Sequence, residues 1–130
     1  MSYQLRREAY LMGRDAEFPT TEELEVNLAR LVFRVNALVA VLPIPVRAFL
    51  ELSSGYRPGK YNTAAGGSLR SAHLTCEAVD LKDPDQKVSK YLVGNPDLLS
   101  KFNLYMELPA KTPTWVHLDT RARATRIFTP

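Results

Sequence analysis

Residues 20–42 read TTEELEVNLARLVFRVNALVAVL and decide the fold class of this chain. Thr20 and Glu23 have the spacing of a capping box, in which each side chain satisfies a free backbone N–H at the start of a helix. Apolar residues then recur in steps of three and four, the period of a helix with one buried face. The pattern predicts one long helix over residues 21–41, ended by the prolines that follow. Its apolar stripe consists of Leu24, Leu28, Leu31, Val32, Val35, Leu38, Val39 and Leu42.

The remainder of the chain reads as short strands and helices separated by turns. Alternating apolar residues predict strands over 46–52, 76–81, 104–108 and 115–119, with an edge strand at 125–128. Short helices are expected over 85–93 and 97–102, and the Gly- and Pro-rich residues 53–72 are expected to form a long loop. These elements predict the α+β class, with the long N-terminal helix packed on a small, mainly antiparallel sheet.

Length and composition limit the classes of protein that remain. A chain of 130 residues with 45% hydrophobic residues predicts one domain, with residues 1–17 as an N-terminal extension whose order is left open. A net charge of +3 is too small for a dedicated nucleic-acid binder, so we expect no nucleic-acid partner. The single cysteine excludes a disulfide within the chain. No apolar leader or membrane-length apolar run is present, so we expect a cytoplasmic protein as synthesised, without membrane insertion.

Both histidines of the chain lie near predicted strands. His73 follows the glycine-rich loop, Asp80 lies inside the next strand, and His117 lies in a later one. Two imidazoles and one carboxylate suit catalytic zinc, because three protein ligands leave a fourth position for water. Any chain with two histidines contains some such triple, so a purely structural role for each histidine also stays open.

Three ordered motifs around these residues carry a family resemblance. Residues 53–58 read SSGYRP, residues 71–80 read SAHLTCEAVD, and residues 115–119 read WVHLD. Together they resemble the M15 family of zinc peptidases, which includes D-Ala-D-Ala carboxypeptidases and phage endolysins that cut peptidoglycan stem peptides. The resemblance implies a Hedgehog/DD-peptidase-like fold. A chain this short without a leader is most similar to the bacteriophage members.

The resemblance also implies roles for individual residues. His73, Asp80 and His117 correspond to the zinc ligands. Arg57 corresponds to an arginine that binds substrate and steadies negative charge during the reaction, a task suited to a guanidinium. Ser71 is expected to donate a hydrogen bond to the substrate or to a group behind the metal ligands.

Two further residues are expected beside the substrate. Tyr56 and Trp115 stand next to the motif residues and are predicted to contact the substrate, with simple packing as the alternative for each. The arginines at 121, 123 and 126 are expected on a solvated face, or to help the protein approach anionic cell-wall polymers.

The general base is a departure from the family pattern. Many members carry an acid three residues before the last histidine ligand, and Thr114 occupies that position here. The remaining acidic candidates are Glu107, Asp119 and Glu77. Glu107 is preferred because a hairpin would bring it close to the strand of His117, although a solvated carboxylate is an equal alternative. Asp119 shares a strand face with His117 and is a candidate for orienting its imidazole.

The second departure is Cys76, which replaces a family glycine between His73 and Asp80. Cys76 is either a small buried residue or a fourth ligand that would close the site and abolish catalysis.

The sequence therefore predicts a zinc-dependent peptidase acting on peptidoglycan stem peptides, of the D-Ala-D-Ala carboxypeptidase or L-alanyl-D-glutamate peptidase type. Phage origin, as an endolysin or a virion-associated enzyme acting on the cell wall, would add virion or tail proteins as partners. The alternative is a non-catalytic M15-like module, structural or wall-binding, that keeps a structural metal.

Overall fold

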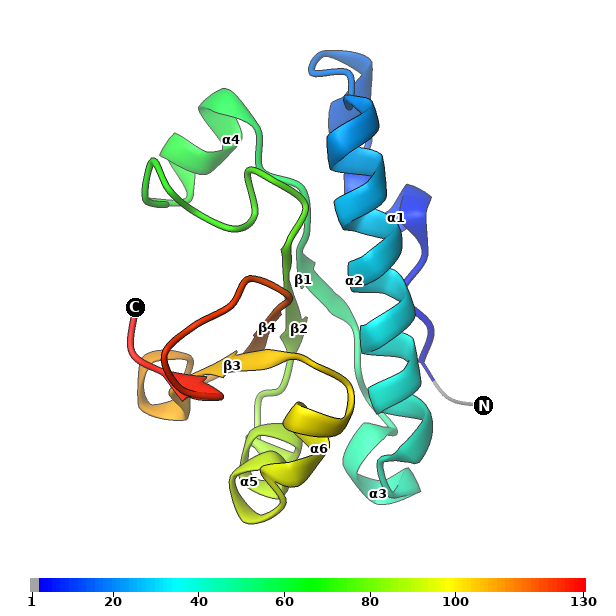
Figure 1. Cartoon of the computed structure of the whole chain (residues 1–130), viewed down its shortest axis with the longest axis vertical. Coiled ribbons are helices and arrows are strands. Elements are labelled where there is room, and N and C mark those ends of the chain that lie inside the picture. The colour runs from blue at the N-terminus through cyan, green and yellow to red at the C-terminus, as the bar shows by residue number, and fades with distance from the viewer. Residues whose placement is uncertain (1–2) are drawn as a thin grey trace.

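A long helix, α2, lies along one side of a five-stranded sheet (Figure 1). The computed structural model describes residues 3–130. The helices are α1 (Arg7–Leu11), α2 (Glu22–Val41), α3 (Ile44–Arg47), α4 (Gly59–Ala64), α5 (Lys87–Gly94) and α6 (Asp97–Lys101), with 3-10 turns η1 (Arg14–Ala16) and η2 (Pro109–Lys111). The strands are β1 (Leu52–Ser54), β2 (Ala78–Lys82), β3 (Tyr105–Glu107), β4 (Trp115–Asp119) and β5 (Ile127–Phe128). The α+β class is confirmed, and the finer likeness to the Hedgehog/DD-peptidase fold stays a prediction.

The expected long helix is confirmed, but its cap lies one residue later than predicted. Thr21 is the N-cap, and its hydroxyl oxygen accepts a hydrogen bond from the backbone N–H of Leu24 at 3.2 Å. Thr20 instead bonds the carboxylate of Glu25, so the Thr20–Glu23 capping box is wrong. The buried side chains of α2 come from the predicted stripe: Leu28, Leu31, Val35, Leu38 and Val39.

The sheet has the strand order β1-β2-β4-β3-β5. Neighbouring strands are antiparallel except β3 and β5, so the mainly antiparallel sheet and the edge strand near residue 128 are confirmed. In the centre, Asp80 of β2 pairs directly with His117 of β4. Side chains of directly paired residues point to the same face of a sheet, so this register brings the two functional candidates together.

The predicted strand over residues 46–52 is wrong. Residues 44–47 form the short helix α3, in which Pro45 occupies the first turn, where a missing N–H costs nothing. The Arg47 guanidinium donates to the carbonyl oxygens of Val39 and Ala40, which ties α3 to the end of α2. The long loop over 53–72 is also corrected in part, because it contains the end of β1 and the helix α4.

The N-terminal segment packs against the domain that follows it. Leu5, Tyr10 and Leu11 are buried, and the Tyr10 hydroxyl donates to the carbonyl oxygen of Ala78 at 2.6 Å. The backbone carbonyl oxygen of Tyr10 accepts a hydrogen bond from the backbone N–H of Tyr56. The segment therefore reaches both β2 and the loop that carries the Arg57 motif.

The other end of the sheet is held by a buried carboxylate. Asp83 follows β2 and accepts hydrogen bonds from the backbone N–H groups of Val88 and Ser89 and from the Ser89 hydroxyl, at 2.9–3.1 Å. These bonds satisfy free donors at the start of α5, where a negative charge is favourable.

Within residues 3–130, no helix combines the length and apolar character that crossing a membrane would require.

Candidate metal centre

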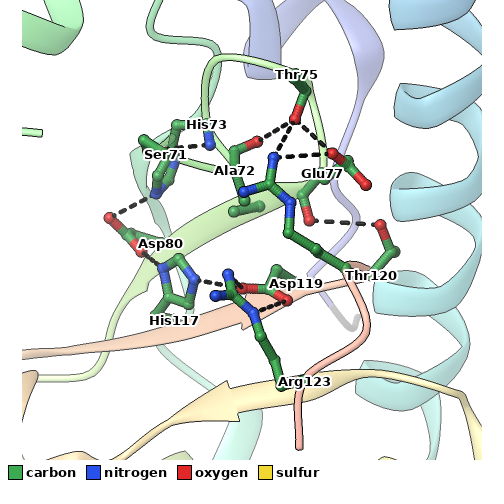
Figure 2. Close-up of polar contacts among 12 residues, drawn as sticks. Ser71, Ala72, His73, Thr75, Glu77, Asp80, His117, Asp119, Thr120 and Arg123 are labelled. Carbon is green, nitrogen blue, oxygen red and sulfur yellow. Dashed lines mark hydrogen bonds and ion pairs between the residues drawn. The ribbon is translucent and has the colours of Figure 1, made fainter. Parts of the chain in front are cut away.

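Three side chains that are distant in sequence converge at the middle of the sheet (Figure 2). His73 comes from the loop before β2, Asp80 from β2 and His117 from β4. One ligand atom from each lies within 4.8 Å of the other two. The structure thus brings together the three residues that the family resemblance implies as metal ligands.

The ring of His73 is fixed with one nitrogen facing Asp80. Its Nδ1–H donates to the carbonyl oxygen of Gly55 at 2.8 Å, which leaves a lone pair on Nε2 in the neutral ring. Nε2 is buried, lies 3.2 Å from Asp80 Oδ2, and makes no hydrogen bond of good geometry with any described residue. A lone pair facing a carboxylate oxygen is unfavourable unless a cation lies between them, so this atom pair fits a metal ion.

The second imidazole, His117, lies between two carboxylates. Its Nδ1 faces Asp80 Oδ1 at 2.8 Å and its Nε2 faces Asp119 Oδ2 at 2.9 Å. Burial lowers the pKa of His117, but the hydrogen bonds to Asp119 and Asp80 outweigh it and raise the pKa to about 9. Burial likewise raises the pKa of Asp80, but the hydrogen bond from His117 outweighs it and holds that pKa well below its ordinary value. Because His117 Nδ1 faces Asp80, a metal ion bound by both residues would take the place of the proton on that nitrogen.

A cavity of about 590 Å³ opens over this cluster. Arg57, Ser71, Glu107 and Trp115 line it together with the three metal-ligand candidates. Tyr56 does not line it: its side chain is buried in the core, and its hydroxyl donates to the carbonyl oxygen of Phe18 at 3.1 Å. This placement favours the packing role that was the alternative for Tyr56, and its substrate contact stays a prediction.

Glu107 occupies the position expected of a general base. Met106 of β3 pairs with Leu118 of β4, so Glu107 lies beside His117 and on the same face of the sheet. Burial raises the pKa of Glu107. Glu107 lines the cavity and makes no hydrogen bond or ion pair with another described side chain, which leaves its carboxylate able to accept a proton.

The other acids are already paired, and Thr114 is exposed. Glu77 bonds the Thr75 hydroxyl at 2.5 Å and Arg121 at 3.1 Å, while Asp119 bonds His117 and Arg123. Thr114 lies in the turn before β4, outside the cavity lining. Of the three acids considered from sequence, Glu107 is the one whose surroundings favour proton transfer.

Arg57 lies at the edge of the cluster, and its guanidinium has an N–H group that no described residue accepts. One terminal nitrogen lies 3.5 Å from the Ser71 hydroxyl oxygen, and its Nε is buried without a hydrogen-bond partner in residues 3–130. Ser71 also accepts a hydrogen bond from the backbone N–H of His73 at 3.2 Å. An arginine with an unused buried donor suits a ligand that brings its own acceptor, such as a carboxylate.

Gly55 shows why this motif needs a glycine. A Cβ at this position would lie 2.2 Å from the carbonyl oxygen of Tyr10. Only a residue without a side chain lets the N-terminal segment approach so closely, and the same glycine offers its carbonyl oxygen to His73.

Cys76 is a buried core residue and not a ligand. It lies before β2 with φ of 59°, so the strand alternation that would place it on the face of Asp80 does not extend to it. Its side chain joins the hydrophobic core, and the group of side chains able to hold a metal does not include it. A positive φ favours glycine, which gives a physical reason for the glycine that the resembling motif carries here.

The Cys76 thiol is expected to be inert in the folded protein. Burial raises its pKa to about 12, so at pH 8 only about one molecule in 10⁴ carries the reactive thiolate. Iodoacetamide should leave the native protein unmodified for hours and label it fully in denaturant, as read by mass spectrometry. Rapid labelling of the native protein would place the thiol at the surface instead.

Two arginines that were expected on a solvated face line the cavity. Arg121 bonds Glu77 and the Thr75 hydroxyl, and Arg123 bonds Asp119. Phe128 of β5 also lines it. The four-residue spacing of Asp119 and Arg123 was the one local sign that these two side chains could pair. The segment that carries Arg123 is neither helix nor strand, so no periodic pattern predicts where its side chain points.

Two imidazoles, a carboxylate, an unpaired acid and an arginine around one cavity are the parts of a metal-dependent hydrolase. Residues 19–119 match the family model of peptidase M15, and the chain therefore belongs to the peptidase M15 family. It is thus a metallopeptidase by family, and the match ends two residues after His117. Comparison with curated proteins found no match, and neither did comparison with solved structures.

Proposed function

We propose that this protein is a zinc-dependent peptidase that hydrolyses the stem peptides of peptidoglycan, encoded by a phage and acting on the cell wall as an endolysin or virion-associated enzyme. The observation that carries the proposal is the cluster of His73, Asp80 and His117 beside the unpaired carboxylate of Glu107. Membership of the M15 family supports the same class of chemistry.

Each residue of the site has a task in peptide hydrolysis. His73 Nε2, an Asp80 oxygen and His117 Nδ1 would hold the ion. Zinc bound there would lower the pKa of water and polarise the peptide carbonyl. Glu107 would accept the proton of the attacking water and pass it to the departing amine. Arg57 would pair with a substrate carboxylate or with the oxygen on which negative charge develops.

The walls of the cavity suit an acidic peptide. Arg57, Arg70 and Arg121 are among the residues that line it, and stem peptides carry free carboxylates. The indole of Trp115 offers a flat apolar wall for the alkyl part of such a peptide. These features favour stem peptides over neutral peptides as substrates.

The test pairs metal analysis with a peptidase assay on purified peptidoglycan. We expect one zinc per chain and a release of free amino groups that stops with chelator and returns with added zinc. Mass spectrometry of the products then distinguishes cleavage after the first L-alanine from removal of a terminal D-alanine. One zinc without any release would contradict the proposal and favour the non-catalytic module, which should sediment with peptidoglycan without cutting it.

A further inference from the structure

A line of contacts leads from the C-terminal segment to the metal-ligand candidate His117 (Figure 2). A terminal nitrogen of Arg123 donates to Asp119 Oδ2 at 2.8 Å, and the same oxygen accepts from His117 Nε2 at 2.9 Å. The Asp119 side chain is fully buried, whereas the Arg123 side chain is 27% exposed. A buried carboxylate needs a charged partner, and Arg123 provides it.

Arg123 makes a second contact that leads to the same ring. Its guanidinium lies over the Phe128 ring, 4.3 Å from the ring centroid. The Phe128 ring in turn lies nearly perpendicular to the His117 ring, with an interplanar angle of 79° and centroids 6.0 Å apart. Arg123 therefore contacts two groups that pack against the His117 imidazole, the Asp119 carboxylate at Nε2 and the Phe128 ring.

We infer that Arg123 is a positioning residue of the metal centre, holding Asp119 and Phe128 so that His117 presents Nδ1 toward Asp80. A carboxylate bonded to the outer nitrogen of a histidine ligand fixes its tautomer and ring orientation and strengthens it as a ligand. Loss of such support lowers metal affinity by about 10- to 100-fold in comparable sites. The inference rests on the metal centre of the proposed function and is independent of the peptide substrate.

Arg126 provides a matched comparison within the same segment. Its guanidinium also lies over an aromatic ring, that of Tyr105, at 4.2 Å from the centroid. It bonds the side-chain oxygen of Asn103 and the carbonyl oxygen of Leu104, and it does not line the cavity. Removing Arg126 therefore removes an equivalent stacked arginine without touching the support of His117.

The experiment measures the zinc dissociation constant of Arg123→Ala and Arg126→Ala by competition with a chromophoric chelator. We expect Arg123→Ala to bind zinc about 10- to 100-fold more weakly than the wild-type protein does. Arg126→Ala should bind zinc as tightly as the wild-type protein. The visible spectrum of the cobalt(II)-loaded protein should change in Arg123→Ala alone, because the geometry of one ligand changes. Thermal unfolding in excess chelator checks that both variants fold.

Two results would overturn the inference: unchanged zinc affinity in Arg123→Ala, or equal weakening in both variants. If Arg123→Ala does not fold, Asp119→Asn tests the same support, since it keeps the shape of the side chain and removes its charge. Unchanged zinc affinity in that folded variant would also overturn it. The zinc-binding measurement uses no peptide. A failure to hydrolyse peptidoglycan would therefore count against the proposed function and would leave the measured zinc affinities unaffected.

Discussion

A His73→Ala variant is expected to lose its bound metal and to release amino groups from peptidoglycan only at the background rate. His73 is one of three ligand candidates, and its Nε2 is buried and directed at Asp80. Removing a direct ligand should lower metal affinity further than the about 10- to 100-fold expected for a supporting residue. Without the metal, no group would lower the pKa of the water or polarise the peptide carbonyl.

Thermal unfolding separates loss of metal from loss of fold. Zinc at 1,000 times its dissociation constant should stabilise the unchanged chain by about 4 kcal/mol, which raises the midpoint of unfolding. The His73→Ala midpoint should not respond to zinc. Cys76→Ala is the matched control, because Cys76 is equally buried three residues away and lies outside the ligand group. A His73→Ala protein that kept one zinc and cut peptidoglycan at the original rate would refute the assignment.

A Glu107→Gln variant is expected to keep its metal and to lose activity by about 10²- to 10⁴-fold in kcat, the usual contribution of a general base. Glutamine has the shape of glutamate but cannot accept the proton. Glu107 makes no ion pair with another described side chain, so the change should disturb the fold little. Metal content, the midpoint of unfolding and the rate of amino-group release are measured on the same preparation.

Glu51→Gln is the matched control for this variant. Glu51 is an exposed carboxylate whose partner is Lys82 at 3.5 Å, away from the cavity. Its replacement should leave both metal content and kcat unchanged. Full activity of metal-loaded Glu107→Gln would mean that another group takes the proton, and the role assigned to Glu107 would be wrong.

The elements with a strong local pattern could be predicted from the sequence. The three-and-four spacing of apolar residues indicated the helix that the structure places at Glu22–Val41, and alternation indicated the strands that carry Asp80 and His117. Where two patterns competed, the prediction failed: the alternation over 46–52 gave way to the helix α3, because Pro45 fits a first helical turn.

Side-chain chemistry also named the metal-ligand candidates in advance. Two histidines and an aspartate offered a possible zinc-ligand set. The resemblance of the ordered motifs to the M15 family was what favoured His73, Asp80 and His117 over a structural role for each histidine. The preference for Glu107 depended on a hairpin, and the pairing of Met106 with Leu118 puts it beside His117.

Other features were decided by tertiary structure alone. The closeness of Gly55 to Tyr10, the left-handed backbone of Cys76, and the place of Arg123 behind His117 all depend on how distant segments pack. Helix and strand periods are encoded locally, since each repeats along the chain. Loops have no such repeat along the chain, and their paths depend on the contacts that they make in the folded protein. The sequence by itself therefore determined which residues could ligate a metal, and only the tertiary structure decided which residues hold those ligands in place.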